Sequence, residues 1–136
     1  MTAPRILIID DDPDFVEITK TILETKQYDV RYAYSRDEGL ARLEEQTPDL
    51  VILDIMMGRG AEGFIMARQM RKDDRFKDTP IVMITSMPEQ TGFDFPGEPI
   101  HPTYLPVTEY LEKPVDPQLL LEKVESLLSK NTENRP

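Results

Sequence analysis

The chain has 136 residues, a formal net charge of −10 at pH 7 and no cysteine. Its length suits one globular domain, and without a signal peptide or an apolar run of about 20 residues we expect a cytoplasmic protein with no membrane span. The lack of cysteine excludes disulfides, thiolate catalysis and cysteine metal sites, while the acidic balance argues against direct nucleic-acid binding, which requires a basic surface.

Short apolar runs alternate along the chain with segments of helical periodicity, a pattern typical of βαβ units and a parallel sheet. The sequence therefore predicts an α/β fold. We expect strands at residues 6–9, 28–34, 49–53, 80–84 and 107–112. The predicted helix starts are two Asp-Pro caps and one capping box, at Asp12-Pro13, Asp116-Pro117 and Ser35–Glu38.

The helices should cover the sheet with apolar faces. In the first helix, which should end near Lys26, the residues predicted to share such a face are Phe15, Ile18, Ile22 and Leu23. A third helix should end near Lys72. After the last helix, the polar stretch 131–136 should be a flexible tail, so the expected domain covers residues 1–130.

The segment from Ser86 to Pro106 interrupts the alternation. It contains five prolines, at positions 88, 96, 99, 102 and 106, which leave no stretch long enough for a stable helix. We expect an irregular proline-rich loop here in place of the fourth helix. The single histidine, His101, lies in this segment and is expected at the surface.

Four of the apolar runs end in polar groups that could act together. The first run leads into Asp10-Asp11, and the others lead into Asp54, Thr85 and Lys113. In an open parallel sheet, ligands bind outside the carboxyl ends of the strands, so these residues should meet in one crevice. Three acids, a hydroxyl and an ammonium would then lie together.

This set of groups suits phosphoryl transfer to a carboxylate. A carboxylate and a phosphoryl group repel each other, so the reaction needs a cation that neutralises charge and holds geometry. Mg²⁺ prefers about six oxygen ligands and keeps several waters, so two carboxylates and one backbone carbonyl would suffice. Lys113 would neutralise a phosphoryl oxygen, and the Thr85 hydroxyl would donate to another.

Each residue also has a structural explanation when it is taken singly. Asp12 before Pro13 is better explained as a helix cap, and Asp54, Thr85 or Lys113-Pro114 alone could be ordinary turn residues. Asp10 and Asp11 precede the cap and should face the crevice. The joint occurrence of these residues, rather than any one of them, indicates the function.

With these residues in place, the chain resembles the receiver domain of two-component response regulators, the CheY-like superfamily, from about Arg5 to Leu128. The segments that carry the resemblance are 6–13, 49–57, 80–86 and 110–114. The resemblance implies a doubly wound, flavodoxin-like, five-stranded parallel sheet in the order 2-1-3-4-5, for which a member of this family is a standard example.

The resemblance also implies a role for each site residue. Asp54 would be the phosphoacceptor, taking the group from a phosphohistidine on a sensor histidine kinase or phosphotransfer protein. The implied Mg²⁺ ligands are Asp11, Asp54 and the backbone carbonyl of Met56, with Asp10 acting through a water. Thr85 and Tyr110 would be the conformational switch, and Lys113-Pro114 would be a cis peptide. Autophosphorylation from a phosphodonor and slow autodephosphorylation are expected, rather than the turnover of a conventional enzyme.

The sequence departs from the family pattern in three places. Gly58 replaces the usual proline after the strand that ends at Asp54, and Glu62-Gly63 arrives one residue late. Met56 and Met87 occupy positions that tune hydrolysis of the acyl phosphate in the family. The segment 86–106 replaces the family's fourth helix, so the output partner, or a second copy of the chain in a homodimer, could bind there.

Two other functions remain open at this point. Asp10-x-Asp12 after a strand, with Thr85 and Lys113, also imitates the motifs of haloacid dehalogenase-like phosphohydrolases, although Asp54 then has no role. A degenerate receiver that binds partners without phosphorylation is the other alternative. The complete set of acids, threonine and lysine argues against it.

Overall fold

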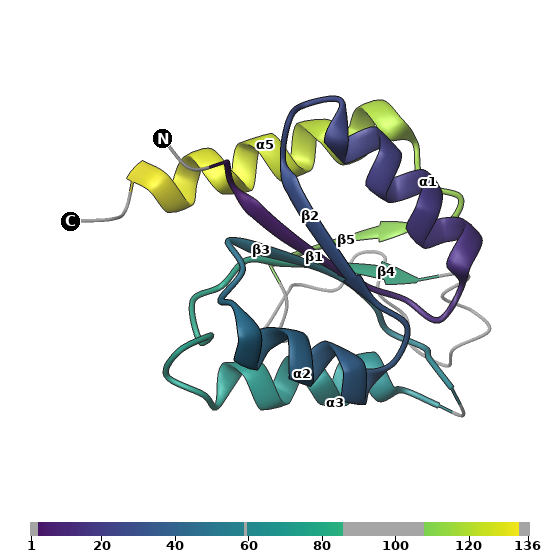
Figure 1. The fold of residues 1–136 in the computed structure, drawn as a ribbon, viewed down its shortest axis with the longest axis vertical. Helices are drawn as coiled ribbons and strands as arrows, with labels where there is room; N and C mark the ends of the chain where they lie inside the picture. The colour runs from purple at the N-terminus through teal and green to yellow at the C-terminus, as the bar shows by residue number, and fades with distance from the viewer. Residues whose placement is uncertain (1–2, 59, 86–107, 134–136) are drawn as a thin grey trace.

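The computed structural model describes residues 3–58, 60–85 and 108–133 and has helices on both faces of one sheet (Figure 1). Its strands are β1 (Arg5–Ile9), β2 (Asp29–Ala33), β3 (Leu50–Asp54), β4 (Ile81–Thr85) and β5 (Glu109–Glu112). Its helices are α1 (Pro13–Glu24), α2 (Arg36–Glu45), α3 (Glu62–Arg71) and α5 (Pro117–Glu133). No helix in these ranges is long and apolar enough to cross a membrane.

The five strands form one all-parallel sheet in the order β2-β1-β3-β4-β5. This order confirms the predicted doubly wound fold. Helices α1 and α5 cover one face of the sheet, and α2 and α3 cover the other (Figure 1). The chain order reverses direction between β1 and β3, which are hydrogen-bonded neighbours, so their carboxyl ends lie at the switch point where such folds bind ligands.

The sheet is buried on both faces, because a parallel sheet with crossover helices has no face left for water. All five residues of β3 are buried. Alternate residues of the strands enter two cores. Leu7, Ile9 and Leu53 pack with α2 and α3, whereas Ile8 and Ile52 pack with α1 and α5.

Local capping fixes where the helices begin. The Asp12 side chain accepts from the Asp14 amide at 3.0 Å, and Pro13 follows as the first helical residue. The Ser35 hydroxyl oxygen accepts from the Glu38 amide at 3.1 Å, and Glu38 reaches back to the amide of Tyr34 at 2.7 Å. The predicted caps therefore form, with Glu38 bonding one residue earlier than in a standard capping box.

Two expectations about the helices are wrong. Ile18 does not lie on the buried face of α1, because its side chain is 60% exposed while Val16, Thr19 and Leu23 are buried. The chain from 131 onward is not a tail throughout, because α5 continues to Glu133. The predicted loop at 86–106, with His101, lies outside the described residues.

Candidate functional site

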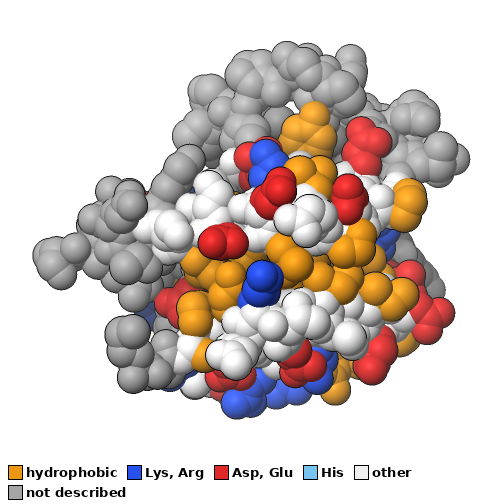
Figure 2. All heavy atoms as spheres, turned by 90° about the horizontal axis from the view of Figure 1, so that it is seen from above, with side chains coloured by type: hydrophobic (Ala, Val, Ile, Leu, Met, Phe, Trp, Pro, Cys, Tyr) orange, Lys and Arg blue, Asp and Glu red, His pale blue; other side chains and the backbone are white. Residues whose placement is uncertain are grey.

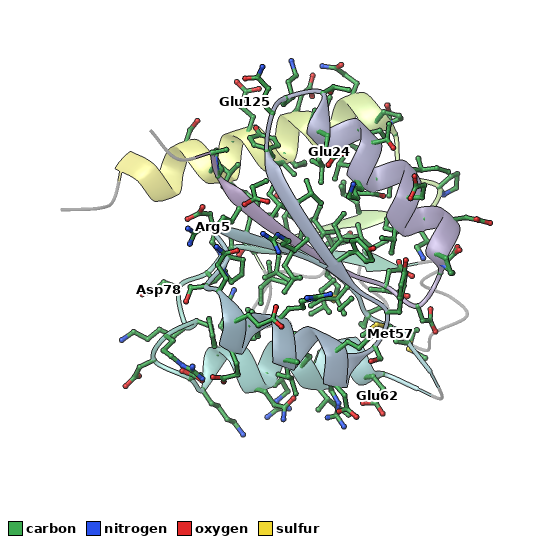
Figure 3. The ribbon with its side chains drawn as sticks, viewed as in Figure 1. Arg5, Glu24, Met57, Glu62, Asp78 and Glu125 are labelled. Atoms are coloured by element: carbon green, nitrogen blue, oxygen red, sulfur yellow. The ribbon has the colours of Figure 1, made fainter. Side chains whose placement is uncertain are left out.

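The site lies at the carboxyl end of the sheet, where β1 and β3 end side by side. Asp10 directly follows β1, and Asp54 is the last residue of β3. Lys113 follows the last residue of β5 and reaches both of them. Met57 and Glu62 mark this end of the molecule in Figure 3, and Arg5 marks the opposite end. The structure thus brings together the acids and the lysine that the sequence analysis selected.

Asp10 is fully buried at the centre of the site. Its Oδ1 accepts a hydrogen bond from the Asp12 amide at 2.9 Å, which aims the carboxylate inward. Its Oδ2 lies 2.8 Å from Lys113 Nζ. Apart from this ion pair, no described group forms a hydrogen bond with this oxygen. Asp10 therefore has an ion-pair partner and an unfilled acceptor position.

Asp54 is almost as deeply buried, with 4% of its surface exposed. Its Oδ1 accepts from the Met56 amide at 3.3 Å, and its Oδ2 lies 3.9 Å from Lys113 Nζ. Burial and the negative charges of Asp10 and Asp11 raise the pKa of the Asp54 carboxyl to about 7, although Lys113 and the Met56 amide act in the opposite direction. The ionised form of Asp54 is therefore electrostatically unfavourable in this site.

Asp11 lies at the exposed mouth of the site. Its Oδ2 accepts a hydrogen bond of 2.9 Å from the Gly58 amide, which ties the loop after β1 to the loop after β3. Gly58 has a φ of 58°, a conformation that L side chains seldom adopt. A glycine at this position supplies both the backbone shape and the N–H donor, and the family's usual proline has neither.

Lys113 is the one cation in contact with the acids among the described residues. Its side chain is 18% exposed. Its Nζ lies 4.4 Å from the centre of the Phe15 ring, within the range of a cation–π interaction. The following peptide bond, Lys113-Pro114, is cis, which is the isomer that the family resemblance implied.

The two residues that the resemblance implied as a conformational switch, Thr85 and Tyr110, occupy the neighbouring strands β4 and β5. The backbone register pairs Thr85 with Glu112 and Met83 with Tyr110. Tyr110 is half-buried and packs against the core beside α2 and α3. The register places Thr85 at the same end of the sheet as the acids, and the described structure does not extend to its side chain.

Three carboxylates at this site could hold a metal ion. Asp10, Asp11 and Asp54 each offer one oxygen, and these oxygens lie within 4.8 Å of one another. If these acids and Lys113 are all ionised, the cluster has a net charge of −2. A divalent cation with a preference for oxygen ligands, such as Mg²⁺, fits this donor set and the unfilled acceptor position on Asp10.

Sequence reasoning missed two contacts near the site. It assigned Phe15 only to an apolar helix face, whereas the ring contacts Lys113. It treated Gly63 only as a shifted family position, whereas a Cβ there would overlap the carbonyl oxygen of Asp54. The only sequence signal for the second contact was a glycine just inside a helix, where glycine is otherwise unfavourable.

The comparisons with known proteins agree with this geometry. Residues 6–125 match the response regulator receiver domain family. The chain belongs to this family. The phosphoacceptor role is the function of receiver domains, which accept phosphate from histidine kinases and bind Mg²⁺ at an acidic pocket. The match favours this interpretation over the alternative of a haloacid dehalogenase-like phosphohydrolase.

Similar proteins include both single receivers and longer regulators. The chain is 35% identical to the DNA-binding dual master transcriptional regulator RpaA of Synechocystis sp., covering 92% of this chain and 49% of RpaA. It is 30% identical to Protein PilH of Pseudomonas aeruginosa, covering 92% of this chain and 98% of PilH. A CheY-like receiver domain protein from Methanospirillum hungatei superimposes with a TM-score of 0.81 at 29% identity, covering 98% of this chain and 100% of that one.

The chain spans about half of RpaA, and it spans 26% of another relative, the response regulator PleD of Caulobacter vibrioides. The similarity to these longer proteins therefore concerns their receiver portion.

Proposed function

We propose that Asp54 is the phosphoacceptor of this receiver domain. The observation that carries the proposal is a buried carboxylate at the end of β3, with Asp10 and Asp11 on one side and Lys113 3.9 Å from its Oδ2. Asp10 is engaged by Lys113 at 2.8 Å, and Asp11 is engaged by the Gly58 amide. Of the two acids that contact Lys113, Asp54 has the longer contact, and its carboxylate oxygen is the nucleophile.

The donor is a phosphohistidine on a sensor histidine kinase or a phosphotransfer protein. One oxygen of Asp54 forms a bond to phosphorus while the phosphorus–nitrogen bond breaks, and the electron pair of that bond stays on the imidazole nitrogen. Lys113 pairs with a phosphoryl oxygen as negative charge moves onto the transferred group. The products are an aspartyl phosphate and a free histidine.

Asp11, Asp54 and the backbone carbonyl of Met56 would hold Mg²⁺, with Asp10 acting through a water. When bound, this ion neutralises the negative charge that keeps a carboxylate and a phosphoryl group apart. Asp10 also keeps Lys113 at the site through their 2.8 Å ion pair. Slow autodephosphorylation would return Asp54 to its free form.

Signalling would follow from rearrangement at the ends of β4 and β5. Thr85 would move towards the phosphoryl group, and Tyr110, which packs at the edge of the core, would turn further inward. We retain the prediction that the output partner, or a second copy of the chain, binds through residues 86–106. We also retain a receiver domain that begins at residue 1, and we extend its end from residue 130 to the end of α5 at Glu133.

Incubation with acetyl phosphate and Mg²⁺, followed by intact mass spectrometry, tests the proposal. We expect one phosphoryl adduct on the wild type and none on Asp54→Asn, which keeps the side-chain shape and removes the nucleophile. The matched control is Asp12→Asn, because asparagine keeps the cap on α1 and Asp12 lies outside the acidic cluster.

The other outcomes support the alternatives. A wild type that is never labelled would indicate a receiver that binds partners without phosphorylation. Rapid turnover of varied phosphomonoesters would indicate a phosphohydrolase. An adduct that persists on Asp54→Asn would place the phosphoacceptor on another residue.

A further inference from the structure

Phe15 contacts Lys113 of the proposed phosphorylation site and also lines an open groove. It is the third residue of α1, so it sits in the turn directly after the acidic loop. Its ring centre lies 4.4 Å from Lys113 Nζ. The same ring lines a groove of about 540 Å³, whose other apolar walls include Ile18, Ile22 and Val115. Hydrophobic side chains gather on this α1 and α5 face of the molecule (Figure 2).

A contact with Phe15 would add to the ion pairs that hold the lysine head at the acids. A lysine has a flexible four-carbon stem and a compact charge, so its head can occupy many positions. Asp10 attracts it from the buried side at 2.8 Å, and Asp54 attracts it at 3.9 Å. Lys113 and Pro114 also line the groove, so the lysine side chain has open space beside it as well as the acids.

We propose that Phe15 is a positioning residue for Lys113. The negative face of its ring holds the ammonium beside Asp10 and in reach of a phosphoryl group on Asp54. This role rests on the function proposed above for Asp54. The proposed effect of Phe15 on the phosphoryl group acts through Lys113, the residue that its ring contacts.

A leucine and a tyrosine at this position separate the role from simple packing. Phe15 also packs against the core beneath α1 and α5, so its loss could act through stability. Phe15→Leu keeps an apolar side chain for that packing but has no π face. Phe15→Tyr keeps the ring. If Phe15 only packed against the core, the leucine and tyrosine variants should phosphorylate at similar rates. The proposed role requires an aromatic face, so only the tyrosine variant should keep most of the wild-type rate.

Phosphorylation from acetyl phosphate is the first measurement, because a small donor makes no use of a protein-docking surface. We expect Phe15→Leu to lower the rate about three- to tenfold, a range typical of a cation–π contact at a half-exposed site. Phe15→Tyr should recover most of that loss. The matched control is Ile18→Ala, which removes apolar surface from the same groove without contacting Lys113 and should leave the rate unchanged.

The effect must also depend on the lysine. In a Lys113→Met background, adding Phe15→Leu should change the remaining rate by less than twofold, because the group that the ring positions is absent. An undiminished effect of Phe15→Leu in that background would overturn the proposal. Equal rates for the leucine and tyrosine variants would overturn it as well.

A second measurement does not depend on phosphorylation. Protons on the carbon next to Lys113 Nζ lie near an aromatic ring, so their NMR signals should show a ring-current shift in the wild type and in Phe15→Tyr, and should lose it in Phe15→Leu. An absent shift in the wild type would refute the contact. A wild type with the shift but without labelling would refute the function proposed for Asp54, and the role of Phe15 with it.

Discussion

The Gly58 amide donates a hydrogen bond of 2.9 Å to Asp11 Oδ2, although the two residues are 47 positions apart in the chain. Gly58 can do so because its φ is 58°. Among the described residues outside its chain neighbours, no atom lies within 4 Å of the position that a Cβ would take. The loop after β3 is therefore shaped by backbone conformation, rather than by packing, to hold an acid of the loop after β1.

We predict that Gly58→Ala lowers the free energy of unfolding by about 1 kcal/mol, because an L side chain is strained at positive φ. Gly58→Asn should cost less, since asparagine tolerates this conformation. Urea denaturation measures both. The control is Gly60→Ala, whose glycine has open space around it and no positive φ. Equal losses at positions 58 and 60 would contradict the prediction.

Gly63 should be far less tolerant than another buried glycine, Gly39. A Cβ on Gly63 would overlap the backbone carbonyl of Asp54 and lie 2.9 Å from Ile55 Cα. Backbone atoms cannot move aside without shifting β3 and Asp54, so Gly63→Ala should cost about 2–4 kcal/mol in thermal or urea unfolding.

Gly39→Ala is the matched control for that prediction. Its Cβ would meet the ends of two side chains, Ile9 Cδ1 at 3.0 Å and Met66 Cε at 3.1 Å. The flexible methionine can give way, and alanine favours a helix, so the change should cost less than about 1 kcal/mol. A smaller loss for Gly63→Ala than for Gly39→Ala would show that β3 and α3 separate easily.

Asp54→Asn should stabilise the protein in a pH-dependent way when Mg²⁺ is removed with a chelator. The folded pKa of Asp54 is about 7, above its ordinary value of 3.8. Between these values the folded state binds more protons than the unfolded chain, so the free energy of unfolding falls as pH rises from about 4 to about 7. Asparagine does not ionise. The variant should gain about 1–3 kcal/mol over the wild type across this window.

Urea unfolding at several pH values measures that gain. Asp14→Asn replaces an exposed carboxylate outside the cluster and should keep the wild-type slope between pH 4 and pH 7. A stability difference between Asp54→Asn and the wild type that does not change with pH would contradict the raised pKa.

Mg²⁺ should raise the thermal stability of the wild type, because an ion that binds only the folded state stabilises it by RT ln(1 + [L]/Kd). At a concentration about 100 times the Kd, the gain would be about 2.7 kcal/mol. Asp11→Ala should remove most of this gain by removing one ligand oxygen. Differential scanning fluorimetry with and without Mg²⁺ tests this, with Asp12→Asn as the control that should respond like the wild type.

Sequence alone predicted the carboxyl end of each strand to within one residue, together with the polar residues found there. Asp10, Asp11, Asp54 and Lys113 could be placed together because parallel strands bring their carboxyl ends to one edge of the sheet. The caps at Asp12 and Ser35 were equally predictable. A cap depends on groups within four residues, and therefore on local chemistry alone.

The tertiary structure decided which side of α1 is buried. This helix has two adjacent stripes with the same spacing, one of Phe15, Ile18 and Ile22 and one of Val16, Thr19 and Leu23. Helical periodicity does not distinguish between them. The structure buries the second stripe, although it contains a threonine, and leaves Ile18 60% exposed.

The burial of this side of α1 also determines which residues contact the site. Because α1 lies with the second stripe on the sheet, Phe15 faces the end of β5 and its ring meets Lys113. The approach of Gly63 to the Asp54 carbonyl likewise depends on how α3 packs on β3. Contacts of this kind join segments far apart in the chain, and their geometry is set by close packing of whole elements rather than by local sequence.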